Sequence, residues 1–107
     1  GITLPPEADW AKNIYWLYSV LIENDFGIDR DELLGELRER GIETRPFFIP
    51  MHKQPVFRKI GIAEGEFPIA DELYAKGICL PSSSSLEEEH IEFICDAIKE
   101  IQRTSSR

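Results

Sequence analysis

The sequence has 107 residues, of which 42% are hydrophobic and 10% aromatic, and its formal net charge at pH 7 is -8. This length suits one folded domain, and the apolar fraction is too high for a disordered chain. The negative charge argues against nucleic acid as a partner, and no apolar run approaches the roughly 20 residues that cross a membrane.

Residues 1–9 contain two adjacent prolines and are predicted to be a segment that leads into the domain. The chain opens without an initiator methionine, so we expect it to be part of a longer protein. Residues 14–22 form the most hydrophobic stretch, rich in aromatic and β-favouring residues. We predict a central strand here, buried on both faces. A helix is the alternative, but Asn13 and Asn24 bracket a run too short for one.

Residues 24–28 are predicted to be a turn, after which Asp29 caps an amphipathic helix. Glu32 follows three residues later and completes a capping-box pattern. Gly41 is expected to end the helix, because glycine readily adopts the left-handed conformation of a helix C-terminus. The charged side of this helix is predicted to be its solvated outer face.

The next stretch is predicted to be a strand that ends in a constrained loop. Arg45 precedes a proline and should be extended, and residues 47–49 form a short apolar run of strand type. Pro50 and Pro55 cannot donate to a sheet ladder, so the chain should leave the sheet between them. The loop would hold His52 at the end of the strand.

The last third of the chain is predicted to contain two helices and a strand. Residues 56–65 indicate a helical turn and a loop, residues 69–76 a short helix, and residues 78–80 a strand closed by proline. Ser85 is predicted to cap a final helix from about Leu86 to Arg103. Residues 104–107 would then be a frayed tail.

These elements predict an α/β fold: a small sheet of three or four strands with helices packed on one face. The chain is expected to be a single domain over residues 1–107. Its other sheet face would be left for another part of the protein. An exposed apolar patch is therefore expected near the first strand, contributed by Trp10, Ile14, Trp16 and Tyr18.

The remaining composition points to a cytoplasmic protein without a metal site. Cys79 and Cys95 lack metal-ligand spacing and are predicted to be buried free thiols rather than a disulfide. No basic segment followed by an apolar one suggests secretion. The carboxylate clusters lie at predicted helix starts, where the helix dipole explains them. His90 is expected to be a surface residue.

Two residues are candidates for ligand binding. His52 could contact a ligand or form a structural hydrogen bond. Arg45 is an isolated cation in a predicted apolar strand, and a buried or half-buried arginine needs an anionic partner. That partner could be a protein carboxylate or a substrate anion.

Several motifs together resemble one family. They are GIETRPFF at 41–48, PMHKQP at 50–55, FPIA at 67–70, ICLP at 78–81, and the serines before LEEE at 86–89. This order resembles the C-terminal small domain of DegT-type sugar-nucleotide aminotransferases, which are fold type I enzymes. The segment at 16–19 is most similar to the perosamine-synthase-like branch.

The resemblance implies a function for the whole protein. Such enzymes use pyridoxal phosphate (PLP), act as homodimers, and move an amino group, commonly from glutamate, to a keto-deoxy sugar nucleotide. Their Schiff-base lysine and PLP contacts belong to a large domain outside this chain, so this chain would hold no catalytic or cofactor-binding residue and be inactive alone. His52, Arg45 and Phe48 would be its substrate-binding residues. The alternative is a free-standing, non-catalytic binding or interaction module of the same ancestry.

Overall fold

A computed structural model gives the structure of the protein and describes residues 1–61 and 67–105. Within these residues, four strands form one antiparallel sheet in the order β1–β2–β4–β3. The strands are β1 (Ile2–Thr3), β2 (Tyr18–Ile22), β3 (Arg45–Pro46) and β4 (Gly77–Leu80). The helices are α1 (Arg30–Glu39), α2 (Pro55–Lys59), α3 (Pro68–Lys76) and α4 (Glu88–Ser105), with 3-10 turns η1 (Asn24–Phe26) and η2 (Met51–Lys53).

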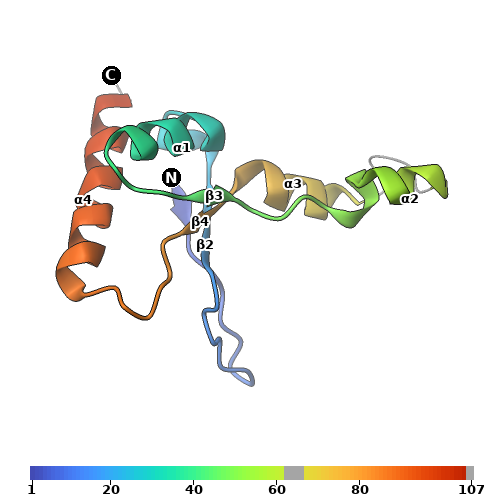
Figure 1. The fold of residues 1–107 in the computed structure, drawn as a ribbon, viewed down its shortest axis with the longest axis horizontal. Helices are drawn as coiled ribbons and strands as arrows, with labels where there is room; N and C mark the ends of the chain where they lie inside the picture. The colour runs from blue at the N-terminus through green and yellow to red at the C-terminus, as the bar shows by residue number, and fades with distance from the viewer. Residues whose placement is uncertain (62–66, 106–107) are drawn as a thin grey trace.

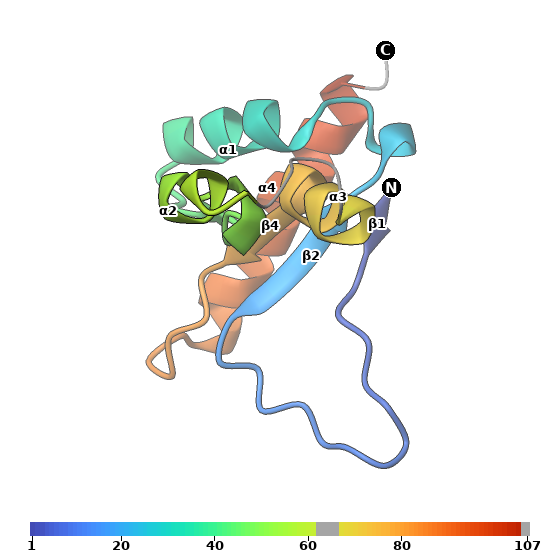
Figure 2. The same cartoon turned by 90° about the vertical axis from the view of Figure 1, so that its right-hand side faces the viewer.

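The helices divide between the two sides of the sheet. The two longest, α1 and α4, lie against one face, whereas α3 and α2 extend outward from the other side (Figures 1 and 2). The expected α/β fold with a small sheet is therefore confirmed, and the helices that build its core share one face. The short helices form an arm that projects away from this core.

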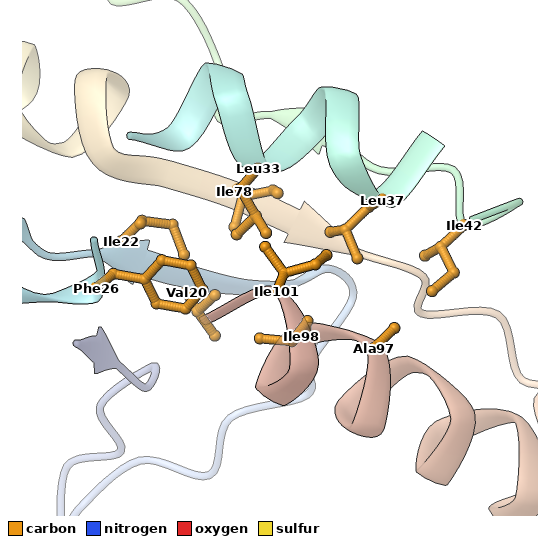
Figure 3. Packing of buried hydrophobic residues seen from close by; sticks show 10 residues of the cluster. All are labelled: Val20, Ile22, Phe26, Leu33, Leu37, Ile42, Ile78, Ala97, Ile98 and Ile101. Carbon is orange, nitrogen blue, oxygen red and sulfur yellow. The ribbon is translucent and has the colours of Figure 1, made fainter. Parts of the chain in front are cut away.

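The hydrophobic core fills the space between the sheet, α1 and α4 (Figure 3). Leu33 and Leu37 lie four residues apart, which places both on the same side of α1, and both are buried. The buried apolar cluster comprises Val20, Ile22, Phe26, Leu33, Leu37, Ile42, Ile78, Ala97, Ile98 and Ile101. One layer of helices is thus sufficient to bury the inner face of the sheet.

Local sequence signals predict α1 correctly. The Asp29 carboxylate accepts from the backbone N–H of Glu32 at 2.8 Å, and the Glu32 carboxylate accepts from the backbone N–H of Asp29 at 3.1 Å. The predicted capping box is therefore present. Gly41 follows the helix with a φ of +78°, as expected for a glycine after a helix end.

The predicted strand over residues 14–22 is wrong in its extent and its burial. Strand β2 begins at Tyr18, because its neighbour β4 has only four residues and pairs with positions 18–21. Ile14 and Trp16 are 87% and 73% exposed, in the segment that leads into the strand. Only alternate residues of β2, Val20 and Ile22, are buried, so the strand buries one face.

The second predicted strand is also displaced. Strand β3 comprises Arg45–Pro46, and the backbone N–H of Phe47 donates the last hydrogen bond between β3 and β4, to the carbonyl oxygen of Gly77 at 3.0 Å. Strand β4 begins at Gly77, directly after helix α3. Phe48 and Ile49 lie beyond this end of β4 and therefore have no part of it to pair with. Phe48 and Ile49 are consequently exposed rather than paired.

The final helix begins later and ends later than predicted. It starts at Glu88, and Ser85 instead bonds through its hydroxyl to Ser83 at 2.8 Å. The backbone N–H of Glu87 donates to Nδ1 of His90 at 3.1 Å, so exposed His90 satisfies a donor at the helix start. The helix includes Ser105, whose hydroxyl donates to a backbone carbonyl one turn earlier. Residues 106–107, and residues 62–66 of the predicted loop, lie outside the described part.

The two cysteines differ in solvent exposure. Both are free thiols, as predicted, and Cys79 is buried on β4 with its Sγ atom 3.3 Å from the Ser19 hydroxyl. Cys95 is exposed on α4, so its predicted burial is wrong. The side of α4 that packs against the core is formed by Ala97, Ile98 and Ile101, and Cys95 is not part of it.

Candidate functional site

The structure places His52 inside the arm rather than on its surface. The imidazole is 4% exposed, in the η2 turn between Pro50 and α2. Its Nε2 atom lies 2.7 Å from a carboxylate oxygen of Asp71, and its ring centroid is 5.0 Å from that of Phe67. This geometry favours the structural hydrogen bond over the direct ligand contact considered for His52 from the sequence.

Asp71 also attracts Lys53. The Lys53 Nζ atom lies 3.6 Å from the carboxylate oxygen that contacts His52. The same ammonium group is 5.9 Å from the centre of the Tyr74 ring, within the range of a cation–π contact. Asp71 lies in the first turn of α3, where the helix dipole favours a carboxylate. The η2 turn is thus attached to α3 by two consecutive residues.

Arg45 and Phe48 are on the surface. Arg45 lies on edge strand β3 and is exposed, and within the described residues it forms no ion pair. Arg45 is therefore not the buried or half-buried arginine that the sequence analysis considered, because β3 lies at the edge of the sheet and not in its centre. Phe48 is 60% exposed. Both side chains are accessible to a ligand or another protein domain.

Phe48 belongs to an exposed aromatic cluster that the sequence did not predict. Its ring stacks on Trp16 with a centroid separation of 6.2 Å and an interplanar angle of 23°. The Phe47 ring is tilted by 58° against that of Phe48, and their centroids are 5.8 Å apart. The cluster joins the segment before β2 to the segment after β3. Of the four residues expected to form an exposed apolar patch, Trp10, Ile14 and Trp16 are exposed and Tyr18 is half-buried.

Arg30 is the buried cation that sequence reasoning missed. It is 7% exposed, and its Nη1 atom donates to the carbonyl oxygens of Tyr74 at 2.6 Å and Gly77 at 2.9 Å. Its Nε atom donates to Asp31 at 2.7 Å. A sequence signal existed: Arg30 is the first residue of α1, where the helix dipole disfavours a cation. A cation at that position indicates a specific partner elsewhere.

A second charged group lies where β2 and α3 meet. Lys76 Nζ donates to carboxylates of Glu23 at 2.9 Å and Glu72 at 3.0 Å. The hydrogen bond from Lys76, followed by one from Thr3, lowers the pKa of Glu23 below its ordinary value of 4.5. The hydrogen bond from Lys76 to Glu23, and to a lesser extent the one to Glu72, raises the pKa of Lys76 above its ordinary value of 10.5. Both residues are therefore charged at neutral pH.

An apolar groove lies between α4 and the sheet. Its volume is about 670 Å³, within the range of small-molecule sites. Its wall is mostly aliphatic and aromatic, with side chains from β1, β2, β4, α4 and the segments next to them, and serines 82–84 and exposed Lys99 also line it. A smaller hollow of about 450 Å³ lies near Gly41 and His90.

The described residues do not fit a PLP site or a metal site. A lysine that binds PLP needs a desolvated position inside a cofactor pocket. Lys12, Lys59 and Lys99 are exposed, while Lys53 contacts Asp71 and Lys76 contacts two carboxylates. Among the described residues, no group of three potential ligand side chains could hold a metal ion, and no helix is long and apolar enough to cross a membrane.

Comparison with known proteins identifies relatives over most of the chain. Residues 1–99 match the DegT/DnrJ/EryC1/StrS aminotransferase family. A GDP-perosamine synthase from Vibrio cholerae is 33% identical over 93 residues, which cover 87% of this chain and 25% of that protein. A GDP-perosamine synthase from Escherichia coli O157:H7 is 38% identical over 86 residues, 80% of this chain and 22% of that protein.

The fold has a matching relative among solved structures. It superposes with a TM-score of 0.79 on S. venezuelae DesV in complex with a ketimine intermediate, at 28% identity. The match covers 100% of this chain and 27% of DesV. The chain therefore spans about a quarter of the length of the relatives that it matches.

Proposed function

The chain belongs to the DegT/DnrJ/EryC1/StrS aminotransferase family, and we propose that it is the C-terminal small domain of a PLP-dependent sugar-nucleotide aminotransferase. The observation that carries this proposal is the family match over residues 1–99, together with similarity to two GDP-perosamine synthases. The proposed reaction transfers an amino group, with glutamate as donor, to a keto-deoxy sugar nucleotide.

The proposed division of labour rests on the length of the relatives, of which this chain spans about a quarter. A large domain of the same protein would bind PLP and supply the lysine. PLP supplies the electron sink that makes amino transfer possible. We propose that the full-length protein is a cytoplasmic homodimer, and that the present chain alone binds no PLP and is inactive.

The contribution of this chain would be to shape the sugar-nucleotide site. Arg45 and Phe48 are exposed and are proposed to contact the substrate. A guanidinium group pairs well with phosphate oxygens, and an aromatic face packs well on a flat ring. His52 is buried and bonded to Asp71, so we assign it a supporting role in the η2 turn that follows Phe48.

The test is to purify the full-length protein and record its absorbance with PLP. Transamination is then measured with glutamate and a panel of 4-keto-6-deoxy and 3-keto sugar nucleotides. A PLP band together with amination of one of these sugars would support the proposal. A protein that folds but neither binds PLP nor aminates a sugar would refute it and favour the non-catalytic module.

A further inference from the structure

The contact between His52 and Asp71 constrains which imidazole nitrogen carries a proton. An ionised carboxylate only accepts hydrogen bonds, so Nε2 of His52 must donate at the observed distance of 2.7 Å. In the neutral imidazole, the proton is then on Nε2 and Nδ1 is the acceptor.

Asp71 is well placed to impose this arrangement. It lies in the first turn of α3, and its backbone N–H donates to the carbonyl oxygen of Phe67 at 3.1 Å. Helix α3 continues without a loop into the central strand β4. The carboxylate is therefore fixed to the sheet, whereas His52 lies in a short turn. Asp71 is the rigid partner of the pair.

The turn itself depends on its side chains for support. Among the described residues, the backbone hydrogen bonds of the turn are short-range, from the N–H of Lys53 to the carbonyl oxygen of Pro50 and from the N–H of Gln54 to that of Met51, each at 3.0 Å. Residues 48–54, all in the described part of the chain, make no ladder contact with β4. The pairs that Asp71 makes with His52 and Lys53 therefore hold the η2 turn against α3, and the segment that begins at Phe48 is attached to α3 through this turn.

We infer that Asp71 is a positioning residue. It selects the Nε2-protonated tautomer of His52 and thereby fixes the η2 turn, and with it the orientation of the neighbouring Phe48. This inference deepens the proposed function and rests on it for its consequence in catalysis. Asp71 touches neither substrate nor cofactor in this scheme, and its effect on the sugar passes through the turn.

The test uses the full-length protein with 15N-labelled histidine and three variants. Asp71→Asn keeps the size of the side chain but can donate as well as accept, so it no longer dictates the tautomer. Asp71→Glu keeps an acceptor-only carboxylate. Glu72→Gln is the matched control, because it removes the next carboxylate on α3, an exposed partner of Lys76, without touching His52. The His52 signals are assigned with a His52→Gln variant.

We expect wild type, Asp71→Glu and Glu72→Gln to show His52 protonated at Nε2, and Asp71→Asn to show a mixture of tautomers or the Nδ1-protonated form. We also expect Asp71→Asn to lower kcat/KM for the keto-sugar roughly tenfold or more, as for loss of a hydrogen bond to a charged group. The half-reaction with the amino donor should stay unchanged, and Asp71→Glu should recover most of the sugar activity.

Two results would overturn the inference. One is an unchanged His52 tautomer in Asp71→Asn. The other is an equal loss in both half-reactions, which would show that Asp71 only stabilises the fold. Failure of the proposed function is a separate result: the wild-type protein would aminate no sugar of the panel, whereas the tautomer measurement would still decide the role of Asp71.

Discussion

The Nη1 atom of Arg30 donates a hydrogen bond of 2.9 Å to the carbonyl oxygen of Gly77 and so connects the first residue of α1 to the first residue of β4. The guanidinium carbon also lies 5.0 Å from the centre of the Tyr74 ring. One side chain therefore joins the helix layer on one side of the sheet to the arm on the other. Sequence spacing does not predict that Arg30 bonds to Gly77, since the two residues are 47 positions apart.

Replacing Arg30 with methionine should destabilise the protein strongly. The substitution keeps much of the apolar stem but leaves two carbonyl oxygens without their charged donor, which costs about 3 kcal/mol of unfolding free energy. Arg30→Lys should cost less, because an ammonium group can still reach one carbonyl. Urea unfolding measures the difference. Arg38→Gln, an exposed position on the same helix, is the control, and an equal loss there would contradict the assignment.

Two glycines should respond oppositely to alanine. At Gly77, an added Cβ would lie 2.6 Å from Cβ of Phe47 and 2.5 Å from the carbonyl oxygen of Leu73, so Gly77→Ala should cost about 1–3 kcal/mol from overpacking. At Gly35, in the middle of α1, nothing lies within 4 Å of the added atom. Gly35→Ala should stabilise the protein by about 0.5–1 kcal/mol because alanine favours helix. Thermal unfolding that gives the same sign for both would refute this prediction.

The Glu23–Lys76 pair should give stability a dependence on pH. Because the pKa of Glu23 is lowered on folding, its contribution is present above the ordinary value of 4.5 and is lost as the pH falls through the folded value. The raised pKa of Lys76 acts in the opposite direction: its contribution is present below 10.5 and is lost as the pH rises above it.

Glu23→Gln tests this pair. The variant should be less stable than the parent at neutral pH, and the difference should shrink below pH 4.5 and again above pH 10.5. Denaturant unfolding across the pH range measures it. Glu36→Gln, on the exposed side of α1, should show no such dependence, and a difference that stays constant with pH would rule out the Glu23–Lys76 contribution.

Substitutions at the exposed and buried site residues should separate substrate contact from structural support in the full-length enzyme. Arg45→Gln should leave stability nearly unchanged because its side chain is exposed, and Phe48→Ala should lower it only slightly, through loss of the exposed stack on Trp16. Both variants should lower kcat/KM for the keto-sugar roughly tenfold to hundredfold. His52→Ala removes a buried, hydrogen-bonded ring and should also lower the melting temperature. Stopped-flow measurement of each half-reaction provides the readout. Full sugar activity in both surface variants would exclude them from the substrate site.

The errors in the extent of the two predicted strands share one physical origin. Aromatic and β-favouring residues at 14–17 and 47–49 suit a strand, yet a strand also needs a neighbour with free backbone groups. Among the described residues, the short β4 pairs with residues 18–21 on one side and with Arg45 and Pro46 on the other, where Phe47 adds a last hydrogen bond. The surplus aromatic residues therefore remain outside the sheet, where Trp16 and Phe48 stack on each other.

The features that local sequence patterns predicted correctly are ones in which all the partners lie close together along the chain. The capping box joins Asp29 to Glu32 three residues away, and Gly41 ends the same helix, because a few neighbouring residues contain all the groups that take part. The exposure of Arg45 and the hydrogen bond between His52 and Asp71, which lie 19 residues apart, follow only from the tertiary structure. Those outcomes depend on which surfaces the packed sheet and helices leave free, and a buried polar group must take whichever partner the fold brings to it.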